Sequence, residues 1–362
     1  MSAPARIRVL IVDDSVTIRQ LLVEGLGAES DLEVVGTLAN GAIALTQLAR
    51  LAPDVIVLDL HMPVLDGIGF LERLRPQHPR LPVLVFSTIT THGAPATLQA
   101  MWAGASDYLA KPHAGDHAAA RAFVHAELAP RLRLLHRGTE TSVRDRAPQS
   151  PVAARAGVPL RHAAPIVSVV AIGASTGGPR ALADVLSALP ADLEAPVLVV
   201  QHIPAAFTRH LADGLASQCE LDVREAKAGA QLEPGTVWIA AGDHHLIVKR
   251  ARGQLVLALE QTPPEHACRP AVDPLLCSLA DVFGPAALAV ILTGMGQDGL
   301  AGCLRIRSVD GQVIAQDEST SVVWGMPGSV VRAGLADAVL PLEAIAAEIL
   351  TRVRRGRVRR VA

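Results

Sequence analysis

Three short polar signatures constrain this chain more than any other feature, because each one directly follows a run of apolar residues. Short runs of Val, Ile, Leu and Ala bounded by glycine predict buried parallel strands. Polar side chains that follow such strands gather at one edge of the sheet, where α/β proteins place their binding crevices. The three signatures are residues 173–178 (GASTGG), the pair Gln201-His202 and residues 294–299 (GMGQDG).

The signatures bring Ser175, His202 and Asp298 to that edge, in this order along the chain. This is the residue set of nucleophilic acyl transfer, in which histidine deprotonates serine and aspartate holds the imidazole. The match to G-x-S-x-G is weak alone, because Gly/Ser-rich turns also cradle phosphates. The order differs from the Ser, Asp, His order of the α/β-hydrolases, so the sequence favours the chemistry without that fold. Asp298 also fits a helix N-cap, and one aspartate can serve both purposes.

A second polar set lies in the first half of the chain, again at the ends of predicted strands. Its members are Asp13, Asp14, Asp59, Ser87 and Lys111. Crowded carboxylates repel one another unless a cation neutralises them, and Mg²⁺ leaves coordination positions open for phosphate oxygens. One carboxylate can then attack a phosphoryl group, while a lysine and a hydroxyl bind the charge that arrives. This set predicts a phospho-acceptor switch.

Composition excludes several classes of protein. The 33 basic and 35 acidic residues give a net charge of −2, which argues against nucleic-acid binding through bulk positive charge. No apolar stretch approaches the roughly 18 residues that span a bilayer, so we expect no membrane insertion. The four cysteines have unrelated spacings, which favours reduced thiols and a cytoplasmic location. An arginine cluster at the C-terminus is typical of a solvated helix end and tail, or of a contact with an acidic partner or a membrane surface; its members are Arg352, Arg354, Arg355, Arg357, Arg359 and Arg360.

The pattern of apolar runs predicts an α/β protein with two doubly wound parallel-sheet domains, the first flavodoxin-like and the second Rossmann-like with an added antiparallel hairpin. The hairpin is expected from residues 244–249 and 254–259, and the last helix over residues 342–354. Between the domains the pattern dissolves into Arg, Ala, Pro, Ser and Gly, which predicts a linker opened by a helix through Leu135. The expected ranges are 6–125 for the first domain, 126–164 for the linker, 165–355 for the second domain and 356–362 for a basic tail.

Four motifs in the first domain form a specific combination: residues 12–15 (VDDS), 58–63 (LDLHMP), 66–67 (DG) and 108–112 (YLAKP). With Ser87, they make residues 6–125 resemble a response-regulator receiver domain. The resemblance implies that Asp59 is the phospho-acceptor and that Mg²⁺ binds Asp13, Asp14, Asp59 and the backbone carbonyl of His61. It implies that Ser87 and Lys111 sense the phosphoryl group, that Tyr108 is the coupled aromatic residue, and that the Lys111–Pro112 bond is cis.

The three polar signatures, together with residues 269–273 (RPAVD) and 324–328 (WGMPG), resemble the catalytic domain of chemotaxis protein-glutamate methylesterases. The resemblance implies that Ser175 is the nucleophile, His202 the base and Asp298 the residue that orients His202. It implies that Thr176 supports this geometry, that backbone near Met295 contributes to an oxyanion hole, and that this domain uses no cofactor. Gln297 stands where the family commonly has asparagine.

The resemblance implies a phosphorylation-activated serine hydrolase that removes glutamate methyl esters, and deamidates glutamines, on chemoreceptors during sensory adaptation. Its partners would be methyl-accepting chemoreceptors as substrates and a chemotaxis histidine kinase as phosphodonor. Two alternatives remain open. One is a signalling adaptor whose second domain only binds receptors, and the other is a hydrolase of small esters behind a receiver domain.

Overall fold

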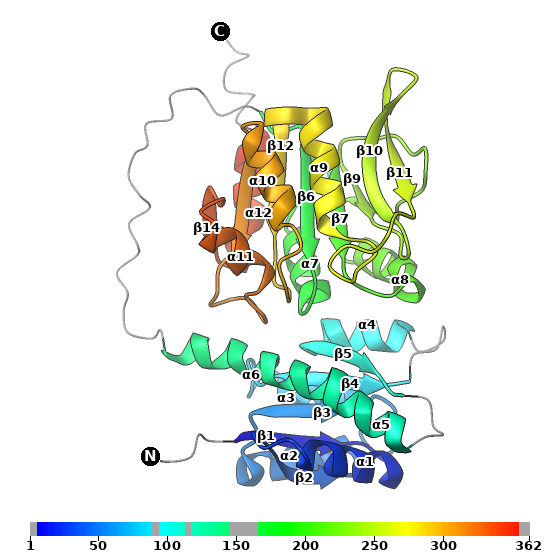
Figure 1. Ribbon diagram of the computed structural model, residues 1–362, viewed down its shortest axis with the longest axis vertical. Helices are drawn as coiled ribbons and strands as arrows, with labels where there is room; N and C mark the ends of the chain where they lie inside the picture. Colours follow the sequence, from blue (N-terminus) through cyan, green and yellow to red (C-terminus); the bar gives the residue numbers. More distant parts are fainter. Residues whose placement is uncertain (1–5, 89–93, 113–116, 145–165, 355–362) are drawn as a thin grey trace. The chain divides into compact units, whose positions relative to one another are not determined.

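The computed structural model describes residues 6–88, 94–112, 117–144 and 166–354. The chain divides into two compact units, Met1–Val143 and Arg144–Ala362, each built around its own parallel sheet (Figure 1). We call them the N-terminal unit and the C-terminal unit. Among the described helices, none combines the length and the apolar composition that crossing a membrane requires.

The N-terminal unit contains a five-stranded parallel sheet in the order β2-β1-β3-β4-β5, which is the predicted flavodoxin-like arrangement. Helices α1 and α5 pack together, and α2, α3 and α4 form the second helical layer. The strands are β1 (Ile7–Val12), β2 (Leu32–Leu38), β3 (Val55–Leu58), β4 (Val83–Ser87) and β5 (Asp107–Ala110). The helices are α1 (Val16–Gly27), α2 (Gly41–Leu51), α3 (Gly67–Leu74), α4 (Ala94–Trp102) and α5 (His117–Phe123).

Local capping explains where the helices of this unit begin. Ser15, Asn40 and Asp66 cap α1, α2 and α3 by accepting backbone N–H groups with their side chains. A Cβ atom at Gly67 would lie 2.5 Å from the carbonyl oxygen of Asp59. Glycine at this position therefore lets α3 begin directly against the end of β3, where Asp59 lies.

Ordered helix continues beyond residue 125, within the range expected to be linker. A π-helical segment, η1 (Val124–Leu128), leads into α6 (Ala129–Arg144). Arg133 of α6 pairs with Glu29 and Asp31, which lie just before β2. The first part of the predicted linker is thus a helix that packs on the N-terminal unit, as the expected helix through Leu135 indicates. Residues 145–165 and the predicted tail at 356–362 lie outside the described residues.

The C-terminal unit contains a seven-stranded parallel sheet in the order β14-β13-β12-β6-β7-β9-β8. The first strand, β6, lies in the middle, with β12 on one side and β7 on the other. The strand order therefore reverses at β6, and the carboxyl end of β6 is a topological switch point, where open α/β sheets bind ligands. The strands are β6 (Val169–Ala174), β7 (Val197–Gln201), β8 (Asp222–Glu225), β9 (Thr236–Ile239), β12 (Ala287–Ile291), β13 (Gln312–Gln316) and β14 (Ala338–Leu340).

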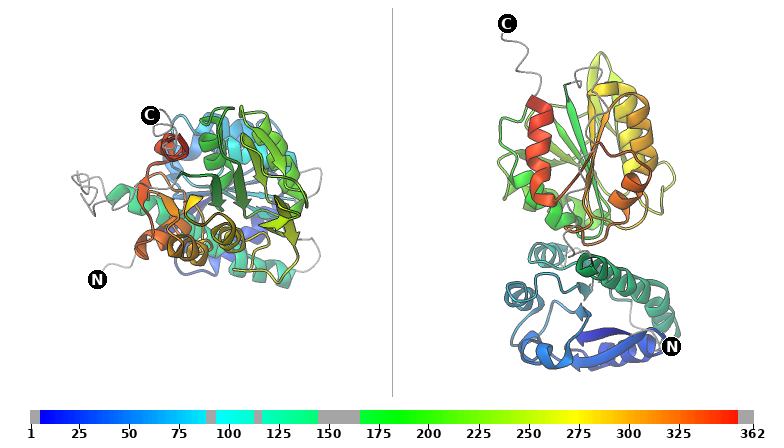
Figure 2. Two further views of the ribbon diagram at one scale, coloured as in Figure 1. Left: turned by 90° about the horizontal axis from the view of Figure 1, so that it is seen from above. Right: turned by 90° about the vertical axis from the view of Figure 1, so that its left-hand side faces the viewer.

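Helices cover both faces of this sheet (Figure 2). Helices α7 (Gly178–Ser187), α8 (Ala205–Ala216) and α12 (Leu342–Arg354) form one layer, and α9 (Val272–Phe283), α10 (Leu300–Ser308) and α11 (Met326–Arg332) form the other. The expected hairpin is present as antiparallel β10 (His245–Ala251) and β11 (Gln254–Glu260), and β10 packs on α9. The core between these layers is built almost wholly from Val, Leu, Ile and Ala.

One arginine of the C-terminal cluster differs from the expectation of a solvated helix end. Arg352 of α12 is buried, with 6% of its surface exposed. Its guanidinium donates to Glu348 at 2.8 Å and to Gln312 at 3.2 Å. Arg352 therefore anchors α12 to β13, because its long apolar stem and its directed charge are both satisfied inside the unit.

Candidate functional site

The turn after β6 fixes the backbone of Ser175 and leaves its side chain accessible. The N–H of Ser175 donates to Thr293 O at 3.0 Å, and its carbonyl accepts from Gly178 N at 2.7 Å and from Gln201 Nε2 at 2.9 Å. Ser175 is half-buried, whereas every other residue from 171 to 179 is buried. The hydroxyl therefore lies on a rigid turn at the switch point of the sheet.

The glycine-rich loop after β12 lies directly against this turn. A Cβ atom at Gly294 would approach Ser175 Cβ to 2.8 Å, so glycine permits the contact. The next residue, Met295, is 51% exposed beside it. Thr176 is buried, and its carbonyl accepts from the hydroxyl of Thr293 at 3.0 Å. Loop and turn thus hold each other in place around Ser175.

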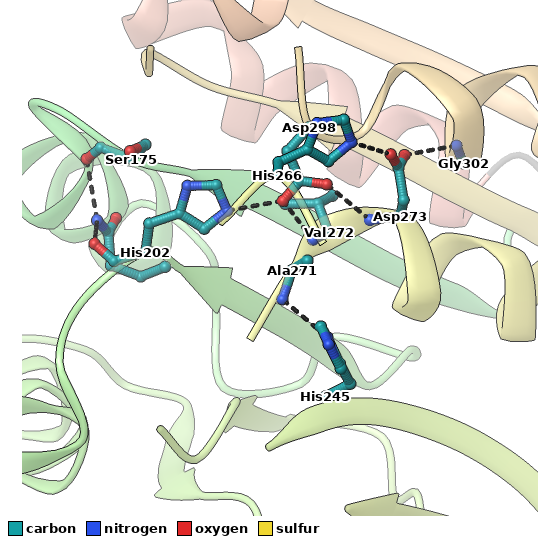
Figure 3. A network of polar contacts seen from close by, with 10 residues as sticks. Ser175, His202, His245, His266, Ala271, Val272, Asp273, Asp298 and Gly302 are labelled. Atoms are coloured by element: carbon teal, nitrogen blue, oxygen red, sulfur yellow. Dashed lines mark hydrogen bonds and ion pairs between the residues drawn. The ribbon is translucent and has the colours of Figure 1, made fainter. Parts of the chain in front are cut away.

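His202 and Asp298 form a direct pair, with His202 Nε2 2.7 Å from Asp298 Oδ2. His202 follows β7, and its N–H donates to Ala174 O at 3.1 Å, next to Ser175. The imidazole lies between Ser175 and Asp298 (Figure 3). The structure therefore brings together the three residues that the sequence placed at one sheet edge.

The electrostatics of this pair favour a charged aspartate. Burial by itself raises the pKa of Asp298, but hydrogen bonds from His202 and from the amides of Val272 and Asp273 outweigh it and lower the pKa. Burial lowers the pKa of His202, yet the hydrogen bond and charge of Asp298, with a contribution from Cys268, raise it above the ordinary histidine value. The arrangement stabilises an imidazolium next to Ser175.

Asp298 caps a helix, and this helix is not the one that follows it in the chain. Helix α10 follows Asp298 in the chain, and its N-cap is Gly299, without a side-chain cap. Asp298 instead accepts the first two amides of α9, Val272 N at 2.7 Å and Asp273 N at 3.0 Å. The aspartate therefore serves both purposes that the sequence allowed, because one carboxylate binds the imidazole and a helix N-terminus together.

Three further residues join this network that sequence reasoning did not assign to the site. His245 is buried, accepts Ala271 N at its Nδ1 atom and donates from Nε2 to Pro263 O. His266 lies 2.9 Å from the carboxylate of Asp273. The main sequence signal was the RPAVD motif that contains Asp273. His245 begins β10 and His266 lies in a turn, and a single histidine in either place carries no pattern of its own.

The predicted switch residues of the N-terminal unit also lie together. Asp13, Asp14 and Asp59 offer carboxylate oxygens that all lie within 4.8 Å of one another. Lys111 Nζ lies 2.8 Å from Asp13 Oδ2 and 2.9 Å from Asp59 Oδ1. Asp13 Oδ2 is buried and has no well-directed hydrogen bond besides this ion pair. Three carboxylates with a free lone pair fit a hard divalent cation such as Mg²⁺.

Burial and mutual repulsion both disfavour the charged form of the carboxylates in this cluster. Burial raises the pKa of Asp13, and the neighbouring Asp59 raises it further, while Lys111 opposes both. Burial lowers the pKa of Lys111, but its two carboxylate partners outweigh this and raise it, so the ammonium stays charged. A cation that bound here would relieve the repulsion between the carboxylates.

The other predicted switch residues lie on strands β4 and β5 and on the loop after β3. Ser87 is the buried last residue of β4, and its carbonyl accepts from Lys111 N at 2.9 Å. Tyr108 lies half-buried on the neighbouring strand β5, and His61 follows Asp59 by two residues on an exposed loop. The cis bond in the described part of the chain is Arg269–Pro270. The expectation of a cis Lys111–Pro112 bond is therefore wrong, and Lys111 reaches both carboxylates without it.

Comparison with known proteins gives a consistent result for both units. Residues 170–349 match the CheB methylesterase family, and residues 9–122 match the response regulator receiver domain family. A protein-glutamate methylesterase/protein-glutamine glutaminase of Trichodesmium erythraeum is 44% identical over 96% of this chain and 99% of its own length. A protein of the same name from a Nocardioides species is 47% identical over 97% of this chain and 96% of its own.

A solved structure resembles the C-terminal unit. The catalytic domain of the Thermotoga maritima CheB methylesterase superposes with a TM-score of 0.50 and is 44% identical, covering 51% of this chain and 97% of that one. Two relatives that match this chain along almost its whole length at more than 40% identity leave no ambiguity of family. The chain belongs to the CheB methylesterase family, in the form that carries a response-regulator receiver domain ahead of the methylesterase domain.

Proposed function

We propose that this protein is a phosphorylation-activated serine hydrolase that demethylates glutamate methyl esters and deamidates glutamines on chemoreceptors. The observation that carries the proposal is the His202–Asp298 pair, held beside the half-buried Ser175 at the switch point of the sheet. The names of the relatives, protein-glutamate methylesterase/protein-glutamine glutaminase, supply the substrate class.

Ser175 is the nucleophile in this proposal, and His202 is its base. Because Nε2 of His202 is committed to Asp298, Nδ1 is the ring nitrogen that accepts the proton of the Ser175 hydroxyl. The serine oxygen attacks the ester carbonyl, methanol leaves with a proton from His202, and water then hydrolyses the glutamyl-serine ester with His202 again as base. A glutamine side chain gives the same acyl-enzyme with ammonia as the leaving group, so one site performs both reactions.

An oxyanion hole is best supplied by the loop after β12. The Ser175 amide is already bound to Thr293 O, so it is not available for the developing oxyanion. Within residues 166–354, the Met295 amide makes no backbone hydrogen bond, and Gly294 keeps this loop against Ser175. We assign the Met295 amide as a donor to the oxyanion and Thr176 as support for the turn, because its carbonyl ties the turn to Thr293.

The receiver provides the switch. Asp59 accepts the phosphoryl group, and the carboxylates of Asp13, Asp14 and Asp59, with the backbone carbonyl of His61, would hold Mg²⁺. When bound, Mg²⁺ neutralises charge on the carboxylates and on the incoming phosphoryl oxygens. Lys111 contacts both Asp13 and Asp59, so it is placed to pair with the phosphoryl group, and Ser87 offers a hydroxyl. Tyr108 on β5 is the aromatic residue coupled to this change.

The partners follow from this chemistry. Methylated chemoreceptors are the substrates, a chemotaxis histidine kinase is the phosphodonor, and both reactions take place in the cytoplasm. We further propose that phosphorylation of Asp59 shifts the population of the protein from a less active toward a more active form.

The direct test is methanol release from radiolabelled, methylated receptor membranes, with and without acetyl phosphate as a small phosphodonor. The proposal predicts release that rises with the phosphodonor. Release without stimulation would keep the enzyme and remove the switch. No release from several receptor sources would favour a signalling adaptor that only binds receptors.

A further inference from the structure

The first turn of α9 holds Asp298, the proposed triad aspartate, through backbone N–H groups. The first N–H groups of a helix have no partner within it and need other acceptors. Here the amide of Ala271 donates to His245 Nδ1, and the amides of Val272 and Asp273 donate to the two oxygens of Asp298. All three donors are therefore bound by side chains, two of them by Asp298 (Figure 3).

The relation between α9 and α10 is reciprocal. Asp298 lies just before α10 and caps α9, whereas Asp273 lies in α9 and caps α10 by accepting Gly302 N at 2.6 Å. A Cβ atom at Gly302 would lie 2.5 Å from Leu276, so the two helices approach as closely as glycine allows. Each carboxylate thus fixes the helix on which the other depends, and movement of Asp273 would displace Asp298.

His266 completes a second histidine–carboxylate pair, 2.9 Å from Asp273. It lies in a tight turn closed by reciprocal backbone bonds between Glu265 and Cys268. Both central residues of this turn, His266 and Ala267, have positive φ angles, of 51° and 59°. Glycine and asparagine favour such positions, so histidine there is conformationally disfavoured. Because His266 keeps this disfavoured backbone conformation while its ring contacts a buried carboxylate, we infer that the contact is functionally important.

We propose that Asp273, held by His266, is a positioning residue for the triad: it fixes Asp298, and through Asp298 it fixes the imidazole of His202. This inference rests on the proposed hydrolase function and adds two residues to its machinery. The four side chains form one chain of contacts in the order His202, Asp298, Asp273 and His266, in which the middle link is the Asp273 amide bound to Asp298 Oδ1.

The charges in this chain of contacts support the assignment. Burial raises the pKa of Asp273, and the nearby Asp298 raises it further, while the Gly302 amide and His266 oppose them. His266 is therefore the side chain that offsets the negative charge of Asp273, a second buried carboxylate close to Asp298. Without it, two neighbouring carboxylates would repel each other at the point where Asp298 must stay in place.

The test uses two variants of the full-length protein, Asp273→Asn and His266→Gly. Asp273→Asn removes the charge and keeps an oxygen for Gly302. His266→Gly removes the ring and also relieves the positive φ angle, which offsets part of the stability lost with the ion pair, so the variant should still fold. The matched control is Asp281→Asn, which removes an exposed acid from the same helix, paired with Arg305 outside the network.

Two readouts are measured on each variant: kcat and KM for methanol release, and the low-field proton resonance of the His202–Asp298 hydrogen bond. We expect kcat to fall about 10- to 100-fold in Asp273→Asn and about three- to tenfold in His266→Gly, with KM within about twofold, since small misplacements of catalytic groups have effects of this size. The low-field resonance should shift or broaden in both variants and stay unchanged in Asp281→Asn.

A wild-type kcat and an unmoved low-field resonance in His266→Gly would overturn the proposal. If Asp273→Asn fails to fold, His266→Gly alone decides, because its side chain is partly exposed and its backbone is relieved. If the wild-type protein releases no methanol, the hydrolase function fails, but the resonance still tells whether His266 positions Asp298. A folded His266→Gly protein with lower kcat and a moved resonance would establish the positioning role.

Discussion

The two sites of this chain differ in how they satisfy their buried carboxylates, although both lie at the carboxyl ends of parallel strands. Asp298 accepts three directed hydrogen bonds, from His202 and from two amides of α9, and its pKa is lowered. Asp13 shares one lysine with Asp59, its buried Oδ2 has no donor besides that lysine among the described residues, and its pKa is raised.

The difference corresponds to two kinds of function. A group that must hold an imidazole in one orientation through every turnover benefits from fixed donors that need no rearrangement. In the proposed switch, a carboxylate that exchanges a cation and a phosphoryl ligand needs oxygen atoms that are not already bound by several fixed donors of the protein. The C-terminal site is therefore preorganised, and the N-terminal site is poised for a ligand.

The largest expected effect tests whether the C-terminal site is catalytic. Ser175→Ala should lower kcat for methanol release by at least about 10⁴-fold, because it removes the attacking oxygen. Thr176→Ala is the matched control from the same turn, and it should lose far less. Comparable losses in the two variants would count against Ser175 as the nucleophile.

The second effect tests the directed donors of Asp298. Asp298→Asn should reduce kcat about 10³- to 10⁴-fold, since the amide cannot accept from His202 and from both helix amides with the same charge. The carboxylate raises the pKa of His202, so its removal lowers that pKa. Because the base must be neutral, the acidic limb of the kcat/KM profile should move to lower pH. If the acidic limb stays in place or moves to higher pH, Asp298 does not raise the pKa of His202 and the proposed His202–Asp298 pair is wrong.

The third effect tests whether the N-terminal site is the phosphorylation switch. Asp59→Asn should abolish stimulation by acetyl phosphate, expected at about 5- to 150-fold from the usual size of coupling between sites, and should leave basal release intact. Deleting residues 1–150 should raise basal release, if the receiver restrains the hydrolase. Stimulation that persists in Asp59→Asn would place the phospho-acceptor elsewhere, and unchanged basal release after the deletion would require another form of control.

The smallest effect lies outside both sites. Arg352→Met should lower the free energy of unfolding by about 1–3 kcal/mol, because it removes a buried guanidinium together with its hydrogen bonds to Glu348 and Gln312. Arg354→Met, at an exposed position of the same helix, should change it by less than about 0.5 kcal/mol. Denaturant titration of both variants measures the difference, and equal stabilities would show that Arg352 behaves as a surface residue. Neither substitution should change kcat.

The sequence was sufficient to predict the layers and both polar clusters, because apolar runs and the polar residues after them carry that information locally. It predicted the hairpin and the bounds of α12 for the same reason. Strands β2 and β8 were not identified from their sequences, since both mix polar with apolar residues and lie at sheet edges. Edge strands are half-solvated and give weaker patterns.

The contacts behind the triad could not be predicted, because they join residues that are distant in sequence. Ala271 meets His245 across 26 residues, and Gly302 meets Asp273 across 29. Nothing in the neighbouring sequence distinguishes His245, at the start of β10, or His266, in a turn, from histidines without such contacts. Arg352 was misplaced for a related reason: its neighbours are arginines of a basic tail, and only the packed unit brings Gln312 to it.

The most direct measurement of the central claim is peptide mass spectrometry of the enzyme, quenched with acid during turnover of a methylated receptor. The account predicts a glutamyl ester on the peptide that contains Ser175, present in the wild-type protein and absent in Ser175→Ala. Steady methanol release without any adduct on Ser175, or with an adduct on another residue, would contradict the account.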